Sequence, residues 1–313
     1  MLIHMTRVAK IYSSSYSYPK ISWKALDATI LATTKDSMST APLVHGITLG
    51  AAASVIVDAS GEIHRNELGG HSSATLVAFT PEGRQLGEAA VMGMAANARG
   101  TATEVARLAL IPYETLTSGL GALTSRHWQF AHTAGEEGVL VMSDVALSDG
   151  QTASMSAVGL LGALLGKLRA NSRAPAGTPV SIAIPPVGDA EGAVARAASL
   201  LHDAAHLGGW KLVAAPSAAQ ALGVALARKW PFGKEPWTSP AVRVLVLDMG
   251  ASSTIAAVIK LTPPAAPEIK GSSPRGAKAE VLAEASDAFL GASLYNEKLF
   301  DHFAAKVKET YVR

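Results

Sequence analysis

Apolar and polar positions follow their clearest pattern in residues 242–261, which read VRVLVLDMGASSTIAAVIKL. Two apolar, β-branched runs, 244–247 and 255–259, have the length of buried strands. The turn between them, residues 248–253, contains a carboxylate, a glycine and two small hydroxyl residues. A turn of this composition brings backbone N–H groups close to a phosphate. The pattern therefore predicts two strands joined by a phosphate-binding turn.

A second stretch near the start of the chain repeats this pattern. Residues 44–58 read VHGITLGAAASVIVD, again a strand, then glycine with small residues, then a strand. The two copies lie about two hundred residues apart. A repeated unit of this kind predicts a duplicated fold that holds a nucleotide between two lobes.

The rest of the chain predicts helices and strands in alternation. Asp189 is expected to cap one helix, whose apolar face runs from Val194 through Leu201 to Ala205 and which Gly208 and Gly209 end. The other predicted helices are 88–96, 154–168, 217–229 and 291–312, and the other predicted strands are 75–79, 138–142, 179–184, 211–214 and 278–285.

Changes in composition divide the chain into segments. Residues 1–37 are rich in Ser and Tyr, and the first twenty-six contain bases but no acid, which predicts a disordered or non-native extension, with a mitochondrial targeting segment as the alternative. Residues 43–230 are expected to form a first lobe, and the proline-rich stretch 231–240 a hinge. Residues 241–313 are expected to form a partial second lobe, because the chain stops after one amphipathic helix.

Composition excludes several classes of function. Of the 313 residues, 49% are apolar and 17% charged, which is typical of a globular protein, and a net charge of +2 gives no electrostatic argument for nucleic acid or membrane as partner. The absence of Cys excludes disulfides, thiolate metal sites and a Cys nucleophile. The longest apolar segment, 153–165, is shorter than the roughly 20 residues of a membrane span.

Seven short motifs, in order, carry a resemblance to a known family. They are GITLG at 46–50, LVAF at 76–79, GEAA at 87–90, SIAIP at 181–185, AAPSAA at 214–219, the turn and strand at 248–258, and FLG at 289–291. The chain thereby resembles the nucleotide-binding domain of the seventy-kilodalton heat-shock chaperones. The resemblance implies an α/β, actin-like and ribonuclease H-like, duplicated two-lobed ATPase fold, with an incomplete second lobe.

Within that family, the chain is most similar to the atypical fungal branch that pairs with a J-protein, zuotin, in the ribosome-associated complex. The similarity rests on a Met-Ser start at 38–39, Gly-Ile-Thr at 46–48, PFGK at 231–234, AAVIK at 256–260 and LFDHF at 299–303. It implies a cytoplasmic chaperone that assists nascent chains at the ribosome with a J-protein partner.

The resemblance also implies a phosphate site and a weak or absent ATP–Mg²⁺ site. Asp248 is the expected, weak, metal ligand, and the purine-binding motifs of the family are not recognisable in the chain. The implied phosphate-binding residues are Gly46, Thr48, Gly50, Ala51, Ala52, Asp248, Gly250, Ala251, Ser252 and Ser253.

Departures from the family pattern remove the expected catalytic groups. Thr48 stands for the first carboxylate, Ala106 for the catalytic Lys, Ala215 for a Glu and Ile255 for the second Asp. Phosphoryl transfer depends on charges placed around the γ-phosphate. Hydrolysis is therefore predicted to be lost, and no catalytic residue is assigned.

Two other functions stay open from the sequence: an active ATP-hydrolysing chaperone, and a sugar or acid kinase of the actin-like superfamily. Arg107 is a candidate replacement for the missing Lys, although a surface arginine is the simpler interpretation. His202 and His206 have a spacing that metals use, but no third ligand is evident. The stretch 125–132 is aromatic and basic enough for an RNA or partner contact, but packing of Trp128 and Phe130 explains it better.

Overall fold

The computed structural model describes residues 6–7, 44–147, 149–188, 190–230, 241–263 and 277–311. The predicted extension 1–37 lies outside these ranges, except for β1 (Thr6–Arg7), which pairs antiparallel with Asp248 and Leu247. The sequence did not predict this pairing. Asp189 and the predicted hinge 231–240 also lie outside the described residues, so both stay predictions.

A five-stranded sheet forms the centre of the first lobe, in the order β12-β11-β2-β3-β4. Strands β11 and β12 run parallel to β2, and β2, β3 and β4 run antiparallel to one another. Ile47 and Ile56 lie opposite each other, and their burial explains the apolar character of both strands. The strands are β2 (His45–Leu49), β3 (Ala53–Val57), β4 (Ser73–Ala74), β11 (Thr178–Ala183) and β12 (Trp210–Ala214).

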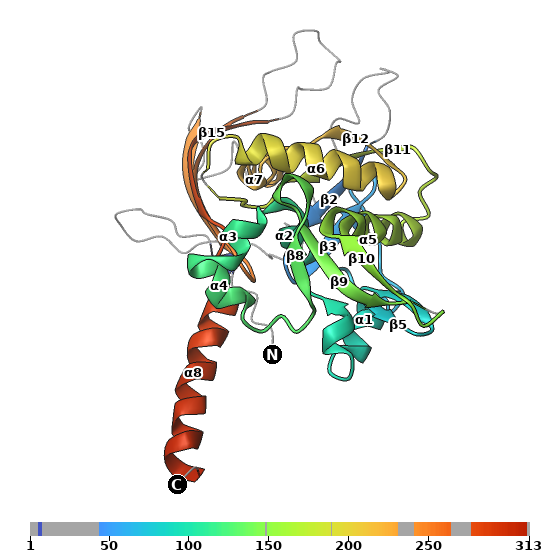
Figure 1. Cartoon of the computed structure of the whole chain (residues 1–313). Helices are drawn as coiled ribbons and strands as arrows, with labels where there is room; N and C mark the ends of the chain where they lie inside the picture. The colour runs from blue at the N-terminus through green and yellow to red at the C-terminus, as the bar shows by residue number, and fades with distance from the viewer. Residues whose placement is uncertain are drawn as a thin grey trace.

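Two long helices, α5 (Ala157–Asn171) and α6 (Ala193–Leu207), lie side by side and cover this sheet (Figure 1). They approach closely at Gly162, where a β-carbon would come within 2.7 Å of Leu207. Trp210 ties the sheet to α5 by donating its indole N–H to the Leu165 carbonyl at 2.9 Å. In the apolar segment 153–165, the small residue Gly162 therefore allows α5 and α6 to pack closely in the core.

Smaller elements complete the first lobe. Two three-stranded antiparallel sheets, β10-β9-β8 and β6-β5-β7, flank the centre. Their strands are β5 (Val77–Thr80), β6 (Gly83–Leu86), β7 (Thr101–Ala102), β8 (His132–Ala134), β9 (Leu140–Ala146) and β10 (Thr152–Ser156). The short helices are α1 (Glu88–Gly93), α2 (Val105–Leu110), α3 (Tyr113–Thr117) and α4 (Gly119–Ser125), with 3₁₀ turns at Ala98–Gly100 and Glu136–Gly138.

The second sheet is antiparallel throughout, in the order β1-β13-β14-β15. It consists of β13 (Val242–Met249), β14 (Thr254–Thr262) and β15 (Lys278–Asp287), together with β1. Helix α7 (Ala218–Lys229) packs on it, and Leu226 shares a core with Ile259. The predicted first lobe, residues 43–230, includes α7. Four of the buried residues of α7 share the core of the second sheet, and Ala221 packs with Ala183 of β11.

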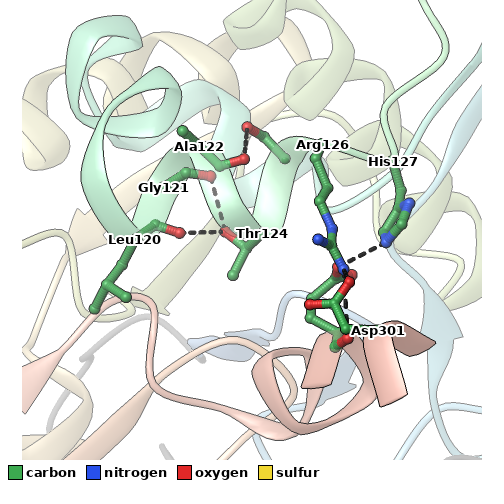
Figure 2. A network of polar contacts seen from close by, with 9 residues as sticks. Leu120, Gly121, Ala122, Thr124, Arg126, His127 and Asp301 are labelled. Carbon is green, nitrogen blue, oxygen red and sulfur yellow. Dashed lines mark hydrogen bonds and ion pairs between the residues drawn. The ribbon is translucent and has the colours of Figure 1, made fainter. Parts of the chain in front are cut away.

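Helix α8 (Ala292–Tyr311) follows β15 and extends away from the rest of the molecule (Figure 1). Its first half is tied to the end of α4 by what we call the α4–α8 clamp, formed by Arg126, His127, Glu297 and Asp301. Glu297 accepts hydrogen bonds from Arg126 Nε at 2.5 Å and lies 2.7 Å from His127 Nε2. Arg126 Nη2 also donates to Asp301 at 2.8 Å (Figure 2).

Several predicted elements differ from the structure at their ends. The helix predicted from residue 154 begins at Ala157, because Met155 and Ser156 pair with β9 and Ser156 caps the helix. Helix α6 begins at Ala193 after Gly192, and Val194, assigned to its apolar face, is exposed. Helix α7 begins at Ala218, because Ser217 and Gln220 form a capping box.

Candidate functional site

The two predicted turns line one cavity of about 130 Å³ between the lobes. The first turn joins β2 to β3, and the second joins β13 to β14. Gly50 and Gly250 both contribute to its wall, as the duplicated pattern predicted. The lining residues are Thr48, Leu49, Gly50, Ala51, Ala52, Ala53, Ala106, Arg107, Ala183, Pro185, Pro186, Ala218, Asp248, Gly250, Ala251, Ser252, Ser253 and Ile255.

The first turn is closed tightly and supported from outside. Gly50 N–H donates to the Ala53 carbonyl at 3.1 Å, and a β-carbon at Gly50 would come within 2.3 Å of the same oxygen. Thr75 supports the turn, because its hydroxyl donates to the Gly50 carbonyl at 2.9 Å and its N–H to the Ala52 carbonyl at 3.0 Å. These bonds fix the path of the backbone at the cavity wall.

The second turn has the same construction. Gly250 N–H donates to the Ser253 carbonyl at 2.8 Å, as in the first turn. The start of α8 supplies the support: Ala292 N–H donates to the Gly250 carbonyl at 3.0 Å, and Ser293 N–H to the Ala251 carbonyl at 2.7 Å. The second turn and α8 are thus one hydrogen-bonded unit.

Five backbone N–H groups in these turns donate no hydrogen bond within the described part of the chain. They belong to Ala51, Ala52, Ala251, Ser252 and Ser253. Successive free amides in a turn bind anions, and phosphate oxygens are their usual acceptors. The sequence had also assigned this role to the amides of Gly50 and Gly250, but both are used to close their own turns.

All the predicted phosphate-site residues except Gly46 line the cavity. Gly46 instead lies buried within β2, where it pairs with Val57 and Ser181. The cavity also contains residues that the sequence did not assign to it, among them Pro185 and Pro186 after β11. Thr48 adds a further polar group, because its buried hydroxyl has no hydrogen-bond partner among the described residues.

The positions at which the family pattern expects catalytic charges lie mostly at this cavity. Thr48, Ala106 and Ile255 line it, and all three side chains are uncharged. Ala215 does not line it, although its neighbour Ala218 does. Among the described lining residues, Asp248 is the only carboxylate and Arg107 the only cation.

Arg107 is not the surface arginine that the sequence favoured, since only 3% of it is exposed. Its guanidinium forms an ion pair with Glu104, and its carbon Cζ lies 5.0 Å from the centre of the Phe289 ring. Glu104 has left-handed backbone, with φ of 55°. Burial raises the pKa of the Glu104 carboxyl, and the neighbouring Arg107 opposes that shift.

The cavity suits the phosphate part of a nucleotide. Its volume is below the roughly 300–1,000 Å³ of sites that enclose a whole small molecule. Free amides, a hydroxyl and a buried arginine are the donors that phosphate oxygens require. For Mg²⁺, which prefers carboxylate and phosphate oxygens, the cavity offers only Asp248 among its described residues.

Two lobes that each contribute a strand–turn–strand unit to a shared phosphate-sized cavity define an actin-like ATPase fold. A comparison with protein families identifies the family: the model of the Hsp70 protein matches residues 44–312, nearly the whole chain. The chain therefore belongs to the Hsp70 family, the seventy-kilodalton heat-shock chaperones. None of the curated protein sequences matches the chain closely enough to count as a relative.

Family membership confirms the coarser sequence predictions. The chain is a chaperone-type, ATP-binding protein with the α/β, actin-like fold of the Hsp70 nucleotide-binding domain, and domains of this family bind ATP with Mg²⁺.

Other candidate sites have structural explanations. His202 and His206 lie exposed on α6, and the described residues contain no group of three or more side chains able to hold a metal.

In the stretch 125–132, Trp128 and Phe130 stack with ring centres 5.5 Å apart, and Phe130 is buried, as the packing interpretation predicted. None of the helices in the described ranges is both long and apolar enough to cross a bilayer.

Proposed function

We propose that this chain is a chaperone subunit that binds the phosphates of ATP without hydrolysing it. The proposal rests on the composition of the cavity wall, whose described residues include one carboxylate, Asp248, and uncharged side chains at Thr48, Ala106 and Ile255. Catalysis of phosphoryl transfer needs charges that stabilise the transferring group and a residue that orients water. Groups that act as one catalytic unit lose nearly all activity together.

Binding of the phosphates of ATP needs hydrogen-bond donors but not the charged catalytic groups. Ala51, Ala52, Ala251 and Ser252 supply the amides, and Thr48 a hydroxyl. Asp248 is the residue that would hold Mg²⁺, an ion that neutralises charge on bound phosphates when present. Bound nucleotide would therefore act as a structural ligand that holds the two turns, and with them the two lobes, together.

The finer biological role in this proposal rests on sequence resemblance to the atypical, ribosome-associated branch of the family. The chain would act in the cytoplasm, paired with a J-protein, and assist the folding of nascent chains at the ribosome. The motifs at 231–234, 256–260 and 299–303 support this assignment. Co-sedimentation with ribosomes in the presence and absence of a J-protein tests it, and J-protein-independent sedimentation, or none in either case, would contradict it.

A steady-state phosphate-release assay tests the loss of hydrolysis. Purified protein with ATP and Mg²⁺ should release phosphate at the background rate, and a panel of sugars should not raise it. Release that disappears in Asp248→Ala would show an active site and overturn the proposal. Release that depends on one sugar would instead assign the chain to the kinases of the superfamily.

A further inference from the structure

Arg107 is a charged residue of the cavity wall that is almost completely buried. It lines the cavity, it is 3% exposed, and it is the only cation among the described lining residues. A buried arginine is expected to have all its donors satisfied, because an unsatisfied buried donor on a charged group is costly. The hydrogen-bond partners of its three guanidinium nitrogens are therefore informative.

Two of these nitrogens have partners and one does not. Nη1 forms the ion pair with Glu104, and Nη2 donates to the Thr124 hydroxyl at 3.4 Å, a long hydrogen bond. Thr124 itself donates to the carbonyls of Leu120 and Gly121 (Figure 2). The remaining nitrogen, Nε, is buried and has no hydrogen-bond partner among the described residues.

The unsatisfied Nε–H and the weakly bonded Nη2 lie on the same edge of the planar guanidinium group. Such a pair of donors matches the oxygens of a phosphate, which bind arginine with two parallel hydrogen bonds. The same cavity wall supplies free amides that also favour an anion. A phosphate group would therefore satisfy donors that the folded chain leaves unsatisfied.

We propose that Arg107 is a phosphate ligand of this cavity and supplies the positive charge that Ala106, the preceding residue, does not. The assignment deepens the proposed function, on which it rests, by naming the residue that recognises the polyphosphate. Arg107 also lies against Phe289, in the segment between β15 and α8. A phosphate held by Arg107 and by the second turn would thus bridge the two lobes.

Glu104 allows a test that a merely structural arginine would not pass. Its carboxylate occupies Nη1 and adds negative charge beside the proposed phosphate site. If Arg107 binds phosphate, Glu104→Gln removes a repulsive charge and should tighten the binding of ATP. If Arg107 only holds the fold together, the same substitution should lower stability and leave ATP affinity unchanged or weaker.

The experiment measures affinity by calorimetry for ATP, inorganic tripolyphosphate and adenosine. Arg107→Gln should weaken ATP and tripolyphosphate binding by about ten- to a hundredfold, the range expected for a charge-assisted hydrogen bond, and leave adenosine binding as it was. Arg99→Gln, at an exposed arginine of the same lobe, is the matched control and should bind as the unaltered protein does. Equal affinities for Arg107→Gln and the unaltered protein would overturn the assignment.

A second measurement covers the case in which Arg107→Gln does not fold. In the unaltered protein, the nuclear magnetic resonance signal of the Arg107 Nε–H group should shift when tripolyphosphate is added. No shift at saturating ligand would overturn the assignment. If neither ATP nor tripolyphosphate binds the unaltered protein, the assignment and the proposed phosphate binding are both wrong, whereas binding that Arg107→Gln leaves unchanged contradicts the assignment alone.

Discussion

Gly291 lies so close to Ser252 that a β-carbon at position 291 would come within 2.6 Å of the Ser252 backbone. This contact joins the residue before α8 to the second turn of the cavity, next to the hydrogen bond from Ala292 to Gly250. The path of α8 and the shape of the phosphate-sized cavity are therefore set by one another.

The first prediction concerns this contact. Gly291→Ala should lower the free energy of unfolding by about 1–3 kcal/mol, because the added methyl group forces the backbone of the turn to move. Urea denaturation followed by circular dichroism measures the change. Gly250→Ala is the control, since its β-carbon would meet only the Ser253 oxygen at 3.5 Å. Equal losses in the two variants would contradict the prediction.

The second prediction concerns ligand access to the second turn. Gly250→Val should abolish ATP affinity, because two further methyl groups at the cavity wall block the approach of a phosphate to the amides of Ala251 and Ser252. Gly250→Ala should keep most of the affinity, since its β-carbon has room. Calorimetric titration with ATP compares the two. Retention of full affinity by the valine variant would mean that the phosphate is held elsewhere.

The third prediction concerns the α4–α8 clamp. Glu297 is 8% exposed at its side chain and serves both Arg126 and His127, whereas Asp301 is 48% exposed and serves Arg126 alone. Glu297→Gln should lower the melting temperature by about 3–6 °C, because a buried charged acceptor contributes more than an exposed one. Asp301→Asn should change it by about 1 °C or less. The reverse order in differential scanning fluorimetry would show that the exposed pair carries the clamp.

The fourth prediction concerns pH. Burial lowers the pKa of His132, whose ring lies against Tyr113, Trp128 and Phe130. Burial and the neighbouring His64 lower the pKa of His45, and Asp58 offsets part of that shift. Both imidazoles therefore bind fewer protons in the folded chain than in the unfolded one. Stability from these groups is complete above their unfolded pKa of 6.5 and declines as the pH falls below it.

The measurement is the melting temperature between pH 7.5 and 5. The unaltered protein should lose more stability over this range than the double variant His45→Gln, His132→Gln. Glu104 acts in the opposite direction in both proteins, because its raised pKa favours the folded state as the pH falls. The difference between the two proteins is therefore the test, and identical pH profiles would show that the histidines do not contribute.

The repeated turns were predictable from sequence because strand, glycine and small residues are local signals. Both hairpins formed where the pattern placed them, and Gly50 and Gly250 line one cavity. The burial of Arg107 was not predictable, because an arginine on a short helix reads as a solvent-facing residue until its neighbours are known. Its partners Thr124 and Phe289 are distant in sequence, and only the fold brings them to it.

The sequence pattern also could not predict that the apolar face of α8 is exposed. Leu299, Phe300, Phe303 and Val307 predicted the apolar side of an amphipathic helix, but each is more than half exposed in the described structure. A periodic pattern shows that a helix has an apolar side and cannot show what lies against it. The same limit applies to α7, whose buried residues pack mostly on the second sheet, with Ala221 against Ala183 of β11.

The geometry of α8 has a mechanical consequence. Its 20 residues span about 30 Å at 1.5 Å per residue, and its first two amides are bonded to the carbonyls of the second turn. The direction of the α8 axis is therefore set at the cavity wall, where the helix begins. The α4–α8 clamp also holds the first half of α8 to Arg126 and His127, so a displacement of the second turn would be transmitted to the end of α4 as well as along α8.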